Sequence, residues 1–210
     1  MLTGYTVREY AARLAAGEPT PGGGSAAALC GALGAALGEM AANFTVGREK
    51  FAAVESDVQA ILGRLESHRL ALLDLTDADA DAYAQVGAAY SMPRDTDEQK
   101  AARTAAIQDA LKAAAQVPLA ATEACAGVIA DLDELRQKAN PNLLSDVAVS
   151  AEFALAALRC AMLNVDVNLA SIKDSGWVAE KRETIDRLLA ESEPVARSVF
   201  DAIAAGLRQS

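Results

Sequence analysis

The stretch from Pro19 to Gly47, PTPGGGSAAALCGALGAALGEMAANFTVG, decides the fold of this chain. Its three consecutive glycines, Gly22 to Gly24, allow the backbone to turn tightly or to approach another group closely. Ser25 follows, and serine is a residue type that caps helix N-termini. The stretch therefore predicts a tight loop that leads into a helix from Ser25 to about Val46.

The predicted helix carries three internal glycines, Gly31, Gly34 and Gly38, among many alanines. A glycine inside a helix costs roughly 1 kcal/mol relative to alanine, so three of them need a structural reason. The reason that we expect is a second backbone packed against this helix at very short range. The helix is therefore predicted to be buried, at the centre of a bundle or at a dimer interface.

The glycine loop has two interpretations that the residues alone leave open. As an anion site, it would present the free N–H groups and the positive end of the helix dipole to a negatively charged ligand. As a connection, it would only turn the chain between two helices. A nucleotide-binding motif is excluded, because no Lys-Ser or Lys-Thr pair follows the glycines and no strand-like segment precedes them.

Helical signals continue along the whole chain. Thr6–Glu9 and Thr96–Gln99 are capping boxes, and Asn140-Pro141-Asn142 predicts a turn. The expected helices cover residues 7–17, 25–46, 97 to the turn at 140, 144–172 and 178–207, and residues 51–90 form one or two further helices. Residues 174–176 end the helix over 144–172. No segment alternates as a strand does. The sequence predicts a single all-α domain over residues 1–210, an up-and-down bundle of long helices, kinked at Pro118 and Pro194.

The composition excludes several classes of protein. A net charge of −10 and a pI near 4.6 argue against nucleic-acid binding, which needs a basic face. Cys30, Cys125 and Cys160 are odd in number and widely spaced, so they fit neither a disulfide framework nor a zinc site. The first ten residues lack the apolar core of a signal peptide, and no apolar run is uninterrupted enough to predict a membrane span. We expect a soluble, cytoplasmic protein.

The composition also favours self-association. Hydrophobic residues make up 52% of the chain but aromatic residues only 4%, so the core must consist of Ala, Leu and Val. Each of these side chains buries little area, and such a chain gains stability by burying a further face against a copy of itself. We therefore expect a homodimer with an apolar, helical interface.

The predicted helix over residues 144–172 carries two stripes. Its core stripe steps by threes and fours through Val147, Ala151, Ala154, Leu158, Met162, Val165, Leu169 and Ile172. A neighbouring stripe holds short polar or small residues: Asp146, Ser150, Ala157, Asn164, Asn168 and Ser171. Asparagine amides can satisfy donors and acceptors without long stems. This stripe is either a set of helix–helix hydrogen bonds or a wall that faces a ligand.

Four aspartates crowd two helical turns, at Asp74, Asp77, Asp79 and Asp81. Most are expected on the surface, but a half-buried one, its pKa raised by burial and like charge, could act as an acid or base. His68 is the one histidine, and we expect it to be exposed rather than catalytic. The basic residues best placed to bind an anionic ligand are Arg48 and Lys50. Two solvated side chains at a corner between helices would explain their presence equally well.

The motifs together resemble one family. The combination of PTPGGGSAAALCGALGAALGEMAANFTVGREKF, DADADAY, MPRDTDEQKAAR, NPNLLSDVAVSAEFAL and NVDVNLASIKD is similar to the cyclodeaminase/cyclohydrolase family of tetrahydrofolate enzymes. The resemblance covers nearly the whole chain in the family's order. One departure is visible, since this family often has three lysines where Arg48-Glu49-Lys50 stands here.

The resemblance implies an all-helical homodimer that acts on a one-carbon unit held by tetrahydrofolate, without metal or redox cofactor. Two reactions are implied: hydrolysis of 5,10-methenyltetrahydrofolate to 10-formyltetrahydrofolate, or cyclisation of 5-formiminotetrahydrofolate to the methenyl form with loss of ammonia. The absence of a formiminotransferase domain in these 210 residues favours hydrolysis. A helical dimer that only binds folate or a protein partner is the non-catalytic alternative.

The resemblance also implies roles for particular residues. Asp79 or Asp146 would transfer the proton, and Asn140, Asn142, Asn164 and Asn168 would bind the pterin edge or the one-carbon nitrogens. The glutamate carboxylates of the substrate, polyglutamylated or not, would be held by the loop residues Gly22, Gly23, Gly24 and Ser25 together with Arg48 and Lys50. Alternatively, these residues would close over the pterin. A net negative protein needs such a local basic patch to bind an anionic folate.

Overall fold

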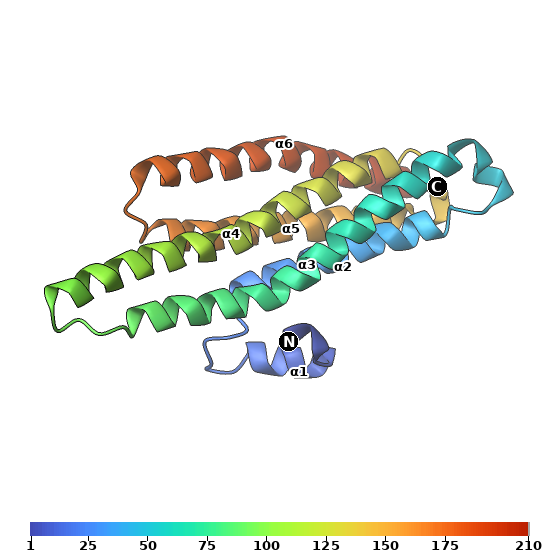
Figure 1. Ribbon diagram of the computed structural model, residues 1–210. Coiled ribbons are helices and arrows are strands. Elements are labelled where there is room, and N and C mark those ends of the chain that lie inside the picture. Colours follow the sequence, from blue (N-terminus) through green and yellow to red (C-terminus); the bar gives the residue numbers. More distant parts are fainter. Residues whose placement is uncertain (210) are drawn as a thin grey trace.

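The computed structural model describes residues 1–209, and all of its regular elements are helices (Figure 1). Within these residues there is no strand, so the all-α prediction is confirmed. The α-helices are α1 Val7–Leu14, α2 Gly23–Asn43, α3 Glu55–Tyr90, α4 Asp97–Leu135, α5 Leu144–Leu169 and α6 Ser175–Leu207. Short 3₁₀ helices lie at η1 Leu2–Gly4, η2 Glu49–Val54 and η3 Pro141–Leu143.

Four of the long helices form a closed up-and-down bundle. Each of α2 to α5 packs on the next helix along the chain, and α2 packs on α5 to complete the ring. Opposed contacts such as Gly38 with Leu65 and Gly31 with Leu72 show that α2 and α3 are antiparallel. The helix α6 lies along the outside of α4 and α5, while α1 lies to one side of the bundle (Figure 1).

The predicted helix starts at Thr6 and Thr96 are confirmed. Both residues form complete capping boxes, in which the threonine hydroxyl accepts the N–H three residues on and that residue's side chain accepts the threonine N–H. The start of α6 was predicted three residues too late. Asp174, assigned to the end of the preceding helix, instead caps α6 by accepting the N–H of Trp177 at 3.1 Å.

The internal prolines do not interrupt their helices. Pro118 lies inside α4 and Pro194 inside α6, and each helix continues for several turns on both sides. One turn after the proline, the hydroxyl of Thr122 donates to the carbonyl oxygen of Pro118 at 2.9 Å. Packing of α4 against four other helices, α2, α3, α5 and α6, holds it together through the missing backbone donor.

The glycines of α2 are explained by close packing, but not all by a backbone. A Cβ on Gly34 would lie 3.2 Å from the backbone nitrogen of Ala154 and 3.2 Å from the carbonyl oxygen of Ser150, both on α5. In contrast, Gly31 and Gly38 face side chains, those of Cys125 and Leu72 and those of Leu132 and Leu65. The prediction of a very close backbone is therefore right for Gly34, whereas the other two glycines make room for side chains.

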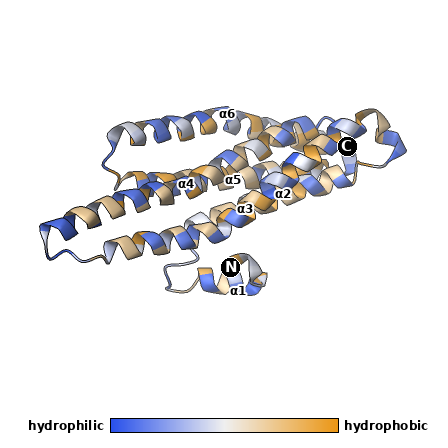
Figure 2. Ribbon diagram, viewed as in Figure 1, coloured by the Kyte–Doolittle hydropathy of each residue, from blue (hydrophilic) through white to orange (hydrophobic). Residues whose placement is uncertain are grey.

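The core stripe predicted for α5 is buried in full, from Val147 to Ile172. Figure 2 shows hydrophobic and hydrophilic residues interspersed along α3, α4 and α6, as expected for helices with one face in the core and one in solvent.

The polar stripe of α5 has a mixed character. The Ser150 hydroxyl donates to the carbonyl oxygen of Gly34 at 2.6 Å, which is a helix–helix bond, while Asn164 and Asn168 are half-buried.

Two helices are long and apolar enough to cross a membrane by length and composition alone, contrary to the sequence prediction. They are α2 and α4, and 61% and 56% of their most apolar windows are buried inside the bundle. Core helices of a soluble protein show the same combination of high hydropathy and internal burial. The hydropathy of α2 and α4 is therefore explained by their packing in the bundle.

We expect Gly34→Leu to destabilise the protein by roughly 1–3 kcal/mol or more, because a side chain there would force α2 away from the backbone of α5. The matched control is Gly63→Leu in α3, where an added Cβ meets nothing within 4 Å. Chemical denaturation measures both. Equal unfolding midpoints for the two variants would contradict the close packing of α2 on α5.

Candidate functional site

The helix α2 begins at Gly23, two residues earlier than predicted, so Gly23 and Gly24 of the predicted loop belong to its first turn. Gly22 is the N-cap residue, so Ser25 lies inside the first turn and its side chain does not cap the helix. The prediction of a Ser25 cap was therefore wrong. Ser25 is instead fully buried, and its backbone N–H, one of the free donors of the first turn, points at Asp79 on α3.

Asp79 is held against the first turn of α2. Its Oδ2 accepts the N–H of Ser25 at 2.9 Å, and its carboxylate fills the space where a Cβ of Gly24 would stand. Burial raises the pKa of Asp79, and the Ser25 N–H partly opposes this rise. The predicted half-burial is confirmed, but the predicted like-charge contribution from neighbouring aspartates is wrong, since burial alone raises this pKa.

Tyr10 was missed by the sequence analysis. It is the buried residue of α1, and its hydroxyl lies 2.8 Å from the Ser25 hydroxyl. Burial raises the pKa of Tyr10, and the charge of Asp79 adds to this effect. Tyr10 therefore joins the N-terminal segment to the Asp79 cluster, which we define as Tyr10, Gly24, Ser25, Asp79 and Asn164.

Asn164 closes the cluster from α5. Its amide nitrogen and oxygen both lie 3.6 Å from the position of a Cβ on Gly23. The Asn164 side chain donates to the carbonyl oxygen of Cys160 at 2.8 Å, and Asn168, one turn further, donates to the carbonyl oxygen of Asn164 at 2.9 Å. The structure thus brings the glycine loop, Asp79 and these two asparagines to one end of α2.

The remaining predicted site residues lie at the other end of α2. Arg48 donates through Nε to the carbonyl oxygen of Phe44 at 2.9 Å, and the Asn140 amide donates to the same oxygen at 3.4 Å. The backbone N–H of Asn140 donates to the buried Thr45 hydroxyl at 2.8 Å. Asn140 also accepts the N–H of Asn142, so its side chain supports the loop that leads to α5.

Three further candidates share that end of the bundle. Lys50 is exposed, with its ammonium 5.6 Å from the ring centroid of Phe51. Asn142 is exposed at the start of η3, and Asp146 is half-buried in the first turn of α5. The basic corner, defined here as Arg48 and Lys50, therefore lies beside Asn140, Asn142 and Asp146.

Within one chain the two groups of residues do not form one site. The 21 residues of α2 lie between them, and a helix rises about 1.5 Å per residue, which separates the ends of α2 by about 30 Å. Asp79 and Asp146 therefore lie at opposite ends of α2, so they are alternative candidates for proton transfer and do not form a pair. A single chain brings together seven of the twelve predicted site residues at one end of α2 and places the other five at the opposite end.

A cavity of about 320 Å³ opens beside the Asp79 cluster. It lies between the N-terminal segment and the bundle and is lined mainly by apolar residues, including Tyr5, Tyr10, Leu29, Leu33 and Leu73. Small-molecule sites in proteins begin at about this size and combine an apolar lining with a few polar groups. Tyr10 belongs to both the cavity and the cluster, so a ligand in this cavity would lie close to Ser25.

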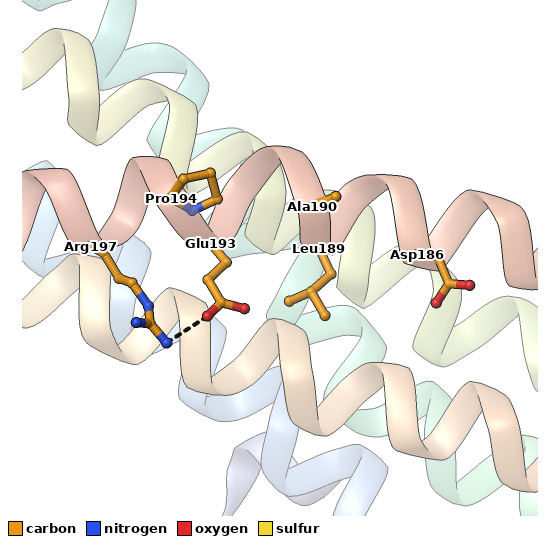
Figure 3. Close-up of a pocket in the computed structure, with 6 residues that line it drawn as sticks. All are labelled: Asp186, Leu189, Ala190, Glu193, Pro194 and Arg197. Carbon is orange, nitrogen blue, oxygen red and sulfur yellow. Dashed lines mark ion pairs between the residues drawn. The ribbon is translucent and has the colours of Figure 1, made fainter.

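Other hollows have less suitable linings. The hollow shown in Figure 3, of about 430 Å³, is lined by six residues of α6 alone, and its one basic side chain, Arg197, is paired with Glu193 at 2.6 Å. Asp186 adds a second carboxylate there, which disfavours an anionic ligand. A further hollow of about 550 Å³ near the end of α6 contains one predicted residue, Asn142.

The other aspartates and the histidine have structural surroundings. Asp77 accepts the N–H groups of Leu2 and Thr3 and fastens η1 to α3. His68 is half-buried rather than exposed, with Nε2 3.6 Å from Asp131 Oδ2, so that prediction was wrong. Burial lowers the pKa of His68, although Asp131 opposes this. His68 and Asp131 pack against each other between α3 and α4.

Neither the cysteines nor the acidic residues form a metal centre in the described part of the chain. Over residues 1–209, no group of three His, Cys, Asp or Glu side chains is placed to hold a metal ion. Cys30, Cys125 and Cys160 are free thiols, as predicted, and burial raises the pKa of Cys125 to about 12. The polar groups of the Asp79 cluster remain the best candidates for chemistry.

The fold and the cluster define an all-helical bundle protein with a half-buried carboxylate at the N-terminus of its central helix. Comparison with known families is more specific. The chain belongs to the formiminotransferase-cyclodeaminase family, whose model matches residues 6–187.

Individual relatives agree with this assignment. The chain is 40% identical over 198 residues to a methenyltetrahydrofolate cyclohydrolase of Methylorubrum extorquens, covering 94% of this chain and 95% of that one. It is 36% identical to the formimidoyltransferase-cyclodeaminase of Rattus norvegicus, of which it spans 36%. A crystal structure of formiminotetrahydrofolate cyclodeaminase from Thermotoga maritima superposes with a TM-score of 0.88 at 28% identity, covering 99% of this chain and 100% of that one.

The raised pKa of Asp79 predicts a pH-dependent effect of Asp79→Asn on stability. The folded protein holds this proton more tightly than the unfolded chain, so the stabilisation is complete below the ordinary pKa of 3.8 and is lost as the pH rises through the folded value. Asparagine avoids that loss and can still accept the Ser25 N–H. The melting temperature of the variant relative to wild type should therefore be higher at neutral pH than near pH 4.

The same comparison for Asp81→Asn, at an exposed position on the same helix, is the control. Melting curves recorded by circular dichroism at the two pH values are sufficient. An Asp79→Asn difference that is equal at both pH values would mean that the burial of this carboxylate does not disfavour its ionisation.

Gly24→Ala tests the contact between the loop and Asp79. The new methyl group would overlap the carboxylate, whose Cγ lies 2.7 Å from the Cβ position, so we expect a loss of roughly 1–3 kcal/mol of stability from overpacking. Gly17→Ala, where a Cβ meets nothing within 4 Å, is the matched control. Equal denaturation midpoints would show that α2 and α3 are not fixed against each other here.

Proposed function

We propose that this protein hydrolyses 5,10-methenyltetrahydrofolate to 10-formyltetrahydrofolate, with Asp79 as the group that transfers the proton. The observation that carries the proposal is the Asp79 cluster: a carboxylate whose pKa is raised by burial and which is aligned by one backbone N–H. Support also comes from the 40% identical relative, named as a methenyltetrahydrofolate cyclohydrolase, which matches over nearly the full length of both chains.

In the proposed reaction, water attacks the methenyl carbon, which lies between two nitrogens and carries a positive charge. The Asp79 carboxylate accepts a proton from the water as the C–O bond forms. The resulting tetrahedral carbon then loses its bond to N5, and N5 receives a proton from Asp79. The hydroxyl of the tetrahedral carbon loses its proton as the formyl C=O bond forms on N10, and this is the one proton released overall. A carboxyl group with a raised pKa is suited to both steps, because it holds a proton more readily than an ordinary carboxyl group and can still release it.

The polar groups around Asp79 would orient the substrate. The half-buried amides of Asn164 and Asn168 offer donors and acceptors for the pterin edge or the one-carbon nitrogens. The cavity beside Tyr10 would accept an apolar ring of the folate. Arg48 and Lys50 would hold the glutamate carboxylates, including those of a polyglutamate tail.

The alternative is cyclodeamination of 5-formiminotetrahydrofolate, and the similarity to the Thermotoga maritima cyclodeaminase favours it. In that reaction N10 attacks the formimino carbon and its own proton passes to the imine nitrogen, and ammonia then leaves with a second proton, which the same carboxyl group supplies. Both reactions pass through a tetrahedral carbon between nitrogens, so one site could serve either. Neither changes the oxidation state of the one-carbon unit, and the proposal includes no metal or redox cofactor.

The proposal includes a cytoplasmic homodimer. Support for the dimer comes from an apolar face that the bundle leaves exposed. It comprises Val149, Phe153, Ala156, Cys160, Leu163 and Val167 on α5, with Leu33 on α2 and Phe44 directly after α2. Soluble monomers rarely expose so continuous an apolar surface.

Turnover of methenyltetrahydrofolate, followed by its near-ultraviolet absorbance, tests the function. We expect wild-type protein to remove the absorbance, and Asp79→Asn to lower kcat by about 10²–10⁴-fold, the usual contribution of general acid–base catalysis, while substrate binding survives. His68→Gln is the control, because His68 faces Asp131 between α3 and α4. Formation of the absorbance from 5-formiminotetrahydrofolate without hydrolysis would favour the deaminase instead.

Three outcomes would count against these assignments. A dead His68→Gln variant with normal turnover by Asp79→Asn would show that the proton-transferring residue is wrong. Binding of folate without turnover of either substrate would favour the non-catalytic module. Absence of both binding and turnover would reject the function altogether.

A further inference from the structure

Thr76, Asp79 and Tyr83 share one face of α3. They follow one another at spacings of three and four residues, which bring side chains to the same side of a helix. Thr76 lines the apolar cavity beside Tyr10, and Asp79 lies against the first turn of α2. The cavity, the carboxyl group and the Tyr83 ring therefore follow in that order along α3.

Tyr83 lies past the start of α2. Because α3 runs antiparallel to α2, it continues from Asp79 to Tyr90 beyond the first turn of α2 (Figure 1). Tyr83 is 56% exposed, and within residues 1–209 its side chain forms no hydrogen bond, ion pair or cation–π contact. One face of an aromatic ring is therefore available to a ligand within one helical turn of Asp79.

The exposed surface around Tyr83 carries no charge. Residues 82–93, AYAQVGAAYSMP, contain no Asp, Glu, Lys or Arg, and most of them are exposed. The solvent face of a helix normally carries charged or polar side chains. This surface suits a flat, uncharged ring system, which can stack on an aromatic side chain, and it offers nothing to the carboxylates of a ligand.

The two asparagine amides of α5 lie on the same side of the α2 N-terminus as Tyr83. The helix α5 also runs antiparallel to α2, because Asn164, near the end of α5, faces Gly23 at the start of α2. Asn168, one turn later, therefore lies beyond the start of α2, as Tyr83 does on α3. Hydrogen-bonding amides and an aromatic ring are thus both available past the first turn of α2.

The proposed substrate has one ring on each side of its reacting carbon. The methenyl carbon joins N5 of the pterin to N10, which carries the aminobenzoyl ring. With this carbon at Asp79, one ring extends toward the cavity and the other toward Tyr83. The hydrogen-bonding edge of a pterin would be left unpaired against Leu29, Leu33 and Leu73 of the cavity. The aminobenzoyl ring has apolar edges and suits that lining.

We propose that Tyr83 orients the folate: the pterin stacks on the Tyr83 ring, and the aminobenzoyl ring enters the cavity beside Tyr10. The pterin edge then faces the amides of Asn164 and Asn168. The proposal rests on the proposed function and assigns one end of the site to each ring. In this orientation N5 and N10 lie on opposite sides of the carbon that faces Asp79, along the axis of α3.

Binding of 5-formyltetrahydrofolate, which contains both rings, tests the proposal without turnover. We expect Tyr83→Ala to weaken this binding by roughly tenfold or more, as the removal of an aromatic side chain from a stacked base does. Tyr83→Phe keeps the ring and should bind as wild type does. Isothermal titration calorimetry measures the affinities, and circular dichroism should show unchanged helical content, because the position is exposed.

Two fragments of the folate separate the two ends of the site. 4-Aminobenzoyl-glutamate lacks the pterin, so Tyr83→Ala should leave its affinity unchanged. Leu29→Trp, which fills part of the cavity, should weaken the binding of this fragment. A reduced pterin without the aminobenzoyl group should show the reverse pattern. Titrations followed by nuclear magnetic resonance measure these weaker affinities.

The matched control is Tyr90→Ala, at a second exposed tyrosine on the same face of α3. Tyr90 lies two helical turns beyond Tyr83, about 10 Å further from Asp79, so this variant should bind 5-formyltetrahydrofolate as wild type does. An unchanged affinity of Tyr83→Ala, or an equal loss in Tyr90→Ala, would overturn the proposal. Weaker binding of 4-aminobenzoyl-glutamate by Tyr83→Ala would also overturn it, since the two rings would then be reversed.

Failure of the proposed function would give a different result. If wild type bound 5-formyltetrahydrofolate but turned over neither folate substrate, hydrolysis and cyclodeamination would both be rejected. The affinities of Tyr83→Ala for the folate and its fragments would still decide the orientation. A wild-type protein that bound no folate would overturn the proposed function and the orientation together.

Discussion

The contact between α2 and α5 at Gly34 constrains the rest of the structure. The backbone of α5 lies so near that a Cβ at Gly34 would be 3.2 Å from two of its backbone atoms. The Ser150 hydroxyl, which donates to the carbonyl oxygen of Gly34, fixes the register of the two helices. Because α2 also packs on α3, its first turn is carried to a fixed position between α3 and α5, where Asp79 and Asn164 lie.

Small residues on α2 allow larger ones on its neighbours. Leu65 and Leu72 of α3, with Leu132 of α4, are fully buried, and they occupy the space that side chains at Gly31 and Gly38 would need. The core is thus built by leucines that pack over a nearly bare helix, which explains how a chain with few aromatic residues forms a closely packed interior. This arrangement leaves the opposite face of α2 partly exposed, with Leu33 50% exposed beside the cavity of the N-terminal segment.

The same packing determines the chemistry available at the site. A carboxylate buried beside an apolar bundle would be unfavourable if it were ionised and unpaired. Asp79 receives one backbone N–H from the free donors of the α2 N-terminus, so its charge is tolerated, but its pKa stays above the ordinary value. That intermediate state suits a group that must both accept and release a proton. It depends on Gly24, since a larger residue would occupy the place of the carboxylate.

The sequence by itself determined the local features. The capping boxes at Thr6 and Thr96 join residues three positions apart, and the core stripe of α5 is a periodicity within one helix, so both could be predicted from neighbouring residues. The candidate residues were identified by type and by family resemblance. Their positions relative to one another were not, because Ser25 and Asp79 are 54 residues apart and Thr45 and Asn140 are 95 apart.

Only the tertiary structure decided which residues meet. It placed the Ser25 hydroxyl against Tyr10 instead of the helix N-terminus, buried one side of His68 against Asp131, and separated the basic corner from Asp79 by the length of α2. The physical reason is that such contacts depend on the register and direction of packed helices, which close-range backbone contacts establish. Residue patterns along one helix specify which face is buried, but not which residue of another helix lies opposite.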